Sequence, residues 1–157
     1  IRPLRYQEPT SGPMAKMSFH DENYGAPPLR VAFLNPYRCT ANRIMTFFKD
    51  PSDLEIQVDA TRPFTFRSTY TFSSAGAREG KYCAITITLP VIADREYRVV
   101  SNAGENTCGL KIDIKQNDGT WLSAPDIVER KSKTPWLASQ GFCVADERFK
   151  QFEVDVK

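Results

Sequence analysis

One histidine, His20, limits the acid–base and nucleophilic chemistry that the chain could perform. A serine or cysteine nucleophile that relies on a histidine base would have to use this residue. His20 lies at the end of an expected strand, and no Gly-x-Ser-x-Gly turn is present to expose a nucleophile. We therefore interpret His20 as a strand-end residue and expect no catalytic residues.

Pairs of carboxylates are the next group that could do chemistry. They occur as Asp21-Glu22, Asp50-Pro51-Ser52-Asp53 and Asp146-Glu147. A glycosidase holds two acids across a cleft, whereas acids close together in sequence are typical of turns and solvated ends. The second pair lacks the spacing of a calcium loop, and the eight glycines form no phosphate-binding or dinucleotide-binding fingerprint. We expect no metal and no cofactor.

The four cysteines are widely separated and include no C-x-x-C pair. They are Cys39, Cys83, Cys108 and Cys143. Zinc sites usually draw ligands in close pairs, so a structural zinc is disfavoured. An even number of isolated cysteines fits two disulfides and an exported protein, while buried free thiols in a cytosolic protein are the alternative.

Four cysteines allow three pairings, and spacing alone does not choose among them. We expect Cys39 to pair with Cys83 and Cys108 with Cys143. The pair Cys83–Cys108 is less attractive because both would start strands that flank the same central strand. Strands two apart in a sheet lie about 9–10 Å from each other, beyond the reach of a disulfide.

The cysteines lie near the ends of short segments in which apolar residues occupy every second position. In residues 64–72 the aromatic residues share one parity, and threonine or arginine occupies the other. Similar segments occur at 15–19, 29–34, 54–58, 83–89, 97–101, 110–114 and 152–156. The pattern predicts an all-β fold, a two-sheet antiparallel β-sandwich of about seven to eight strands. At most short helical turns are expected, near 126–130 and 145–150.

Turn residues suggest how some strands connect. Asn117-Asp118-Gly119 predicts a hairpin that joins the strand at 110–116 to Thr120-Trp121-Leu122, with Trp121 packed in the core or the hairpin. Residues 83–116 are interpreted as a three-stranded meander. Residues 1–13 are rich in proline and polar residues, which predicts a flexible leader or tether, and residues 14–157 are expected to form one domain.

Charge and hydropathy exclude two broad classes of function. The chain has 21 basic and 19 acidic residues, and a dispersed net charge of +2 argues against a nucleic-acid groove. No apolar run approaches the roughly 18 residues that span a bilayer.

Two loops combine basic and aromatic side chains that suit an interface. They contribute Tyr37, Arg38, Arg130, Lys131, Lys133 and Trp136. The first loop is more simply explained as a loop stapled into place by the neighbouring cysteine. For the second, the favoured alternative is a solvated loop whose tryptophan folds back onto the core.

The order of several short segments resembles small bacterial envelope lipoproteins. The segments are Ala15-Lys16-Met17-Ser18-Phe19, Asn35-Pro36-Tyr37-Arg38-Cys39, Arg62-Pro63-Phe64-Thr65-Phe66-Arg67, Tyr82-Cys83, Arg95-Glu96-Tyr97 and Cys108. In that family a disulfide-stapled sandwich of immunoglobulin-like or transthyretin-like type follows a cleaved lipoprotein signal. The resemblance covers roughly residues 14–120. It implies the periplasm or outer membrane as location, and attachment through a lipid on a residue upstream of this chain.

Three classes of function are compatible with the sequence. The favoured class is a non-enzymatic envelope protein that presents loops from a rigid sandwich as an accessory component of a larger surface or secretion system. The second is a periplasmic inhibitor or immunity protein that blocks a toxin or hydrolase. A small enzyme is the third. The expected partner is another envelope protein rather than nucleic acid, and the oligomeric state is left open.

Overall fold

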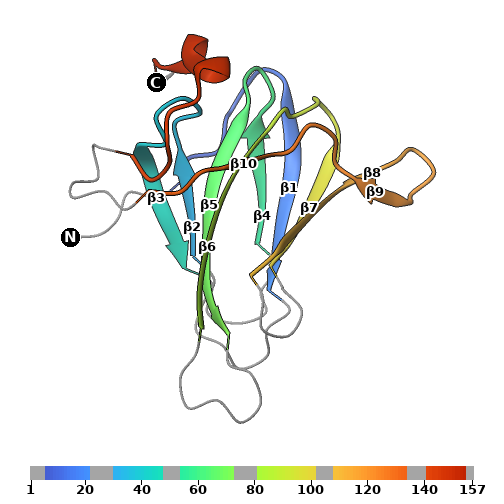
Figure 1. Cartoon of the computed structure of the whole chain (residues 1–157). Helices are drawn as coiled ribbons and strands as arrows, with labels where there is room; N and C mark the ends of the chain where they lie inside the picture. Colours follow the sequence, from blue (N-terminus) through green and yellow to red (C-terminus); the bar gives the residue numbers. More distant parts are fainter. Residues whose placement is uncertain are drawn as a thin grey trace.

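Two five-stranded sheets pack face to face in a sandwich (Figure 1). The computed structural model describes residues 6–21, 30–47, 54–72, 81–101, 108–133 and 141–154. Sheet A has the order β4-β1-β7-β8-β9, and sheet B has the order β10-β6-β5-β2-β3. The all-β sandwich expected from the alternating segments is therefore confirmed.

The strands of sheet A are β1 (Met14–Asp21), β4 (Leu54–Asp59), β7 (Glu96–Ser101), β8 (Leu110–Lys115) and β9 (Trp121–Ser123). Those of sheet B are β2 (Arg30–Leu34), β3 (Ala41–Phe47), β5 (Phe64–Phe72), β6 (Lys81–Leu89) and β10 (Val128–Arg130). A short 3-10 helix, η2 (Glu147–Phe152), follows. Among the described strands the pairs are antiparallel except β1 with β7, which run parallel.

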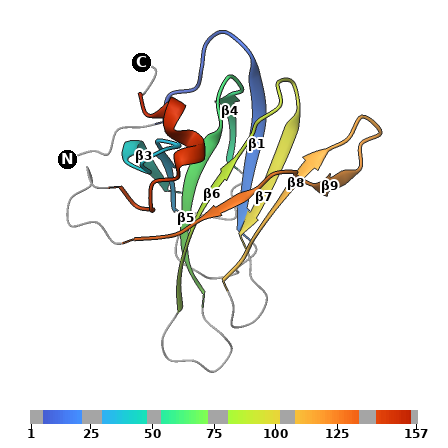
Figure 2. The same ribbon diagram turned by 45° about the horizontal axis from the view of Figure 1, so that its top comes forward.

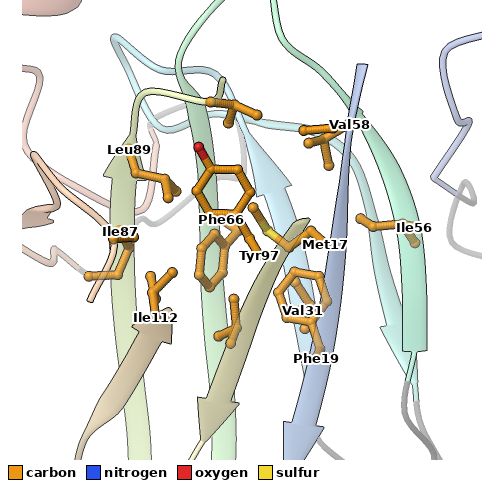
Figure 3. Packing of buried hydrophobic residues seen from close by; sticks show 14 of the residues in the cluster. Met17, Phe19, Val31, Ile56, Val58, Phe66, Ile87, Leu89, Tyr97 and Ile112 are labelled. Atoms are coloured by element: carbon orange, nitrogen blue, oxygen red, sulfur yellow. The ribbon is translucent and has the colours of Figure 1, made fainter. Parts of the chain in front are cut away.

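The core lies between the sheets because each long strand turns one parity inward (Figure 3). Met17 and Phe19 of β1 are buried, and Phe19 meets Phe66 of sheet B edge to face at 5.4 Å. Tyr97 is also buried, and its hydroxyl accepts a hydrogen bond from the backbone N–H of Ile92 at 3.0 Å. Each large apolar side chain buried here contributes about 1.5–3 kcal/mol.

Residues 141–154, called the C-terminal segment below, lie against sheet B on the side away from sheet A (Figure 2). Cys143 is bonded to Cys39, with 5.4 Å between their Cα atoms. The Phe142 N–H donates to the Cys39 carbonyl at 2.9 Å. Gly141 has φ +84°, and a Cβ at this position would lie 2.0 Å from the Arg38 carbonyl oxygen. Glycine is therefore required where the segment meets this turn.

The disulfide pairing expected from the sequence is wrong. The pairs are Cys39–Cys143 and Cys83–Cys108, the latter with 5.5 Å between the Cα atoms. The error follows from the expected meander at 83–116, since β6 belongs to sheet B whereas β7 and β8 belong to sheet A. The connection after β6 crosses between the sheets, so Cys83 and Cys108 face each other across the sandwich rather than along one sheet.

Two local expectations differ from the structure, and one strand was missed. The strand expected at 152–156 is not present in its described part, residues 152–154, and residue 152 ends η2 instead. The first turn of η2 is capped by the Asp146 side chain, and η2 overlaps the short helical turn expected near 145–150. Part of the turn expected at 126–130 is strand β10, and β3 was not expected at all. The hairpin at 117–119 is confirmed, because β8 and β9 pair on either side of it. No helix among the described residues is long and apolar enough to cross a membrane.

The described part of the expected leader packs on the sandwich. Tyr6 lies 4.3 Å from Phe33, measured between ring centroids, and its hydroxyl donates to the Gln57 carbonyl at 2.7 Å. Glu8 accepts the Gln57 N–H at 2.9 Å. Residues 6–8 thus pair with backbone groups of Gln57 on the edge strand β4. This part of the leader is therefore not a free tether. Residues 1–5 lie outside the described residues.

We expect a non-reduced proteolytic digest to yield two linked peptide pairs, one joining Cys39 to Cys143 and the other joining Cys83 to Cys108. Replacing Cys39 and Cys143 together by alanine should lower the free energy of unfolding by about 2–5 kcal/mol, measured by chemical denaturation. A peptide that joins Cys39 to Cys83 would contradict the arrangement of the sheets.

Candidate functional site at the β8–β9 hairpin

The first predicted recognition loop is engaged inside the molecule. The Asn35 side chain accepts the N–H groups of Tyr37 and Arg38 at 2.8 and 3.1 Å and shapes the turn. Tyr37 is buried, and its hydroxyl donates to Glu147 of η2 at 2.9 Å, a bond that raises the pKa of Tyr37. Arg38 is exposed but pairs with Glu153 at 2.6 Å. These two residues fasten the C-terminal segment, and their turn lies next to the Cys39–Cys143 disulfide.

Arg130, expected on an interaction loop, is only 4% exposed. One terminal nitrogen donates to the Pro36 carbonyl and to Thr88 Oγ1, the latter at 3.0 Å. The other donates to the carbonyls of Tyr37 and Val144 at 2.9 and 3.1 Å. Burial lowers the pKa of Arg130. The residue is therefore a buried fastening between β10, the 36–38 turn and the C-terminal segment.

Lys131 and Lys133 remain exposed next to this fastening. Their backbones hold the C-terminal segment, because Val144 N–H donates to the Lys131 carbonyl at 2.8 Å and Lys133 N–H donates to the Phe142 carbonyl at 3.0 Å. Trp136, the aromatic member of the predicted group, lies outside the described residues.

The outer face of sheet A carries an aromatic side chain with two cations close to its ring. Trp121 of β9 is half-buried, with the Arg98 guanidinium 4.4 Å and the Lys115 ammonium 5.9 Å from its ring centroid. Asp113 is buried beside Arg98, with 3.5 Å between oxygen and nitrogen, and lies 3.6 Å from the Lys111 ammonium. A buried carboxylate thus orients the guanidinium that supports the indole. Tryptophan and arginine are the residue types that most often anchor protein interfaces.

The tip of the β8–β9 hairpin is exposed and held by its own hydrogen bonds. Thr120 donates from its N–H and its hydroxyl to one Asp118 carboxylate oxygen, at 2.9 and 2.6 Å. The Gln116 N–H donates to the Thr120 carbonyl at 2.7 Å, and Gly119 supplies the φ of +90° that the turn requires. Residues 117–120 are exposed, and Leu122, on the face opposite Trp121, is 57% exposed. Figure 1 shows the hairpin projecting from the side of the sandwich.

Sequence reasoning placed Trp121 in the core or the hairpin but missed its partnership with Arg98. Both residues occupy outward-facing positions of their strands, so the alternating pattern contained part of the information needed to find the pair. Bringing them together needs the strand order β7-β8-β9 as well.

His20 has a partner that could do chemistry. Its Nε2 lies 3.2 Å from Ser18 Oγ, because residues two apart on β1 share the outer face of sheet A. Ser18 Oγ also donates to the Tyr97 carbonyl at 3.3 Å. β1 lies between β4 and β7, and both neighbours pair with it, so the surrounding backbone amides serve the sheet rather than an oxyanion.

Charges of both signs alternate over the same face. Lys16 pairs with Glu55 at 3.6 Å, and Lys115 with Glu96 at 3.7 Å. A surface of mixed sign suits another protein better than a polyanion. Within the part of the chain that the structure describes, no three histidine, cysteine, aspartate or glutamate side chains gather as metal ligands.

Comparison of the chain with protein-family models, curated proteins and solved structures found no match.

Replacing Arg130 by methionine should lower the free energy of unfolding by about 3 kcal/mol, because buried carbonyls lose a charged donor. The matched control is Arg148→Met. The guanidiniums of Arg130 and Arg148 both lie over the Phe149 ring, at 5.1 and 5.6 Å, but the Arg148 side chain is 65% exposed. The control should lose less than about 1 kcal/mol. Equal losses in chemical denaturation would contradict a buried fastening.

The Asp118 carboxylate should give the hairpin tip a dependence on pH. The hydrogen bonds from Thr120 lower the pKa of Asp118. The stabilisation that the carboxylate gives the turn is therefore fully present above the ordinary carboxyl pKa, and it is lost as pH falls through the lowered value. The Thr120 amide chemical shift, followed by NMR, should report this titration. Asp118→Asn keeps an acceptor but does not titrate, so its Thr120 amide should stay constant; an unchanged acid transition in this variant would contradict the assignment.

Proposed function

We propose that the protein is an exported, non-enzymatic binding protein that docks onto another cell-envelope protein through the β8–β9 hairpin. The observation that carries the proposal is Trp121, half-buried with Arg98 and Lys115 close to its ring, at the base of an exposed, hydrogen-bonded turn. An indole fixed in place loses little conformational entropy on binding. Its cationic neighbours, backed by the buried Asp113, add polar contacts around an apolar centre.

The stapled scaffold supports the same proposal. Two disulfides are compatible with an oxidising compartment. One of them links the sheets, and the other fastens the C-terminal segment, so the hairpin projects from a frame that loses little freedom when a partner binds. In this proposal the protein acts in the bacterial periplasm or at the outer membrane as an accessory of a surface or secretion system. A lipid upstream of the chain would hold it there.

A periplasmic inhibitor or immunity protein is the second candidate. The exposed tip at 117–120, braced by Asp118 and Thr120, favours it, because an inhibitor inserts a protruding, preorganised loop into an enzyme cleft. The two candidates use the same hairpin but different parts of it. An accessory protein would bind through the Trp121 face, whereas an inhibitor would bind through the tip.

The experiment places a photocrosslinking amino acid at Lys115, at Asn117 or, as a control on the far side of the molecule, at Lys150, and recovers partners from the native envelope. The accessory role predicts one structural envelope protein crosslinked from Lys115 and none from Lys150. Stoichiometric recovery of a hydrolytic or toxic enzyme from Asn117, with its activity blocked, would favour the inhibitor. The same products from all three positions would contradict both.

For a partner so identified, Trp121→Ala should weaken binding by about tenfold or more in a titration, while Trp121→Phe should retain most of the affinity. The phenylalanine variant keeps an aromatic surface between Arg98 and Lys115, so it separates loss of the anchor from loss of the fold. Equal affinity in the alanine variant and the unmodified protein would contradict docking through this face.

A further inference from the structure

Strand β9 forms one edge of sheet A, and among the described strands it pairs with β8 alone. In an antiparallel pair, successive residues point their backbone N–H and C=O groups alternately toward the neighbouring strand and away from it. The Ala124 N–H donates to the Ile112 carbonyl at 2.9 Å. At the other end of the hairpin, the Gln116 N–H donates to the Thr120 carbonyl at 2.7 Å. The alternation therefore directs the backbone groups of Leu122, midway between these bonds, toward β8.

The backbone groups of Trp121 and Ser123 point the other way. These residues lie opposite Lys115 and Asp113, in the intervening positions of the register, so their N–H and C=O groups are directed away from β8. Within the described part of the chain, no hydrogen bond uses any of these groups. Pro125 has no N–H and therefore ends the ladder on this edge. β9 thus offers the donors and acceptors of two residues to an added strand.

Two other edges of the sandwich are covered where β9 is not. On β4, at the opposite edge of sheet A, the Gln57 N–H donates to Glu8 and the Gln57 carbonyl accepts from Tyr6. In sheet B, the chain that continues from β10 pairs with the C-terminal segment through Ser132 and Cys143. Proteins usually protect edge strands because unpaired backbone groups pair readily with another strand. The described residues provide no such protection for the outward backbone groups of β9.

Side chains on both faces of β9 are placed to hold an added strand. Leu122 lies opposite Ile114 and shares its inner, core-side face, yet Leu122 is 57% exposed. An apolar side chain directly opposite Leu122 in an added antiparallel strand would cover it, because such pairs have Cβ atoms about 4.5–5.5 Å apart. The residues on either side of that apolar one would fall on the outer face, beside Trp121.

The outer face beside β9 carries an excess of positive charge. Three cations occupy outer positions of β7 and β8 together with two carboxylates: Arg98, Lys111 and Lys115 with Glu96 and Asp113. The Lys111 side chain is 70% exposed, whereas Asp113 is buried. A second copy of β9 would bring the same cations together, while acidic residues of another chain would meet charges of opposite sign.

We propose that β9 is a site of β-strand addition, which takes an extended segment of the partner in which acidic residues flank an apolar one. The backbone of this segment bonds to Trp121 and Ser123, and its apolar side chain covers Leu122. Its acidic side chains lie on the same face as Lys115. The inference rests on the proposed docking function and specifies the form of the partner.

The test titrates the isotope-labelled, oxidised protein with the synthetic peptide Thr-Glu-Val-Glu-Thr and follows amide exchange by NMR. The peptide has the same pattern in both directions, so it suits parallel and antiparallel pairing. At saturation, exchange of the Trp121 and Ser123 amides should slow by about tenfold or more, while the Leu122 amide, which faces β8, should change little. The control peptide Thr-Lys-Val-Lys-Thr should bind about tenfold more weakly or worse.

Ser123→Pro removes one outward donor and leaves the groups that face β8 in place, a position in which edge strands tolerate proline. It should weaken binding of the acidic peptide by about tenfold, whereas the matched control Ser123→Ala keeps the N–H and should bind like the unmodified protein. The exchange measurement on the unmodified protein does not depend on the folding of either variant.

Three results would overturn strand addition. One is the absence of peptide binding. Another is binding without protection of the Trp121 and Ser123 amides, which would mean that side chains alone hold the peptide. The third is concentration-dependent self-association that protects the same two amides, since it would assign the edge to a second copy of the chain.

Two further outcomes separate strand addition from the docking function. An envelope protein crosslinked from Lys115 in equal amount with and without Ser123→Pro would overturn strand addition and support docking through the hairpin. Peptide binding that protects Trp121 and Ser123, with no envelope protein crosslinked from Lys115, would support the strand site and overturn the docking function.

Discussion

Covering the outer face of sheet B is the constraint on which the rest of the structure depends. Thr65, Thr86 and Thr88 on that face are fully or almost fully buried, although they point away from the apolar core. Thr65 and Thr88 hydrogen bond to each other at 2.8 Å, and Arg130 donates to Thr88. The C-terminal segment lies on this side of the sheet, where Phe142 packs against a small cluster of Leu34, Cys39 and Cys143. The disulfide at Cys143 and the hydrogen bond from Arg130 to the Val144 carbonyl also hold the segment in place.

This fastening explains why residues that looked free in the sequence are engaged in the structure. Tyr37 and Arg38 bind η2, and Arg130 binds three backbone carbonyls. Among the described residues, no comparable segment covers Trp121 on the outer face of sheet A, where the recognition surface is proposed. One side of the sandwich is committed to internal contacts and the other presents side chains to solvent.

The sequence predicted what depends on local pattern. Alternation across 64–72 identified β5, and Asn117-Asp118-Gly119 identified the β8–β9 turn, because side-chain parity and positive φ are properties of a few adjacent residues. The disulfide pairing depends on which sheet each strand joins, and nothing within 83–116 states that β6 and β7 separate. The residue type of Arg130 does not reveal whether its side chain is buried or exposed. Its carbonyl partners lie about 14–94 residues away in sequence, so composition could not reveal its role.

Amide hydrogen exchange of the oxidised protein tests most directly whether the C-terminal segment is a true third layer. The N–H groups of Phe142, Val144 and Lys133 bond across the segment's boundary with the rest of the chain. If the segment is part of the cooperative fold, these three amides should exchange nearly as slowly as those of β5 and β6. Exchange of Phe142 and Val144 at the rate of a free peptide, with β5 and β6 still protected, would contradict the account.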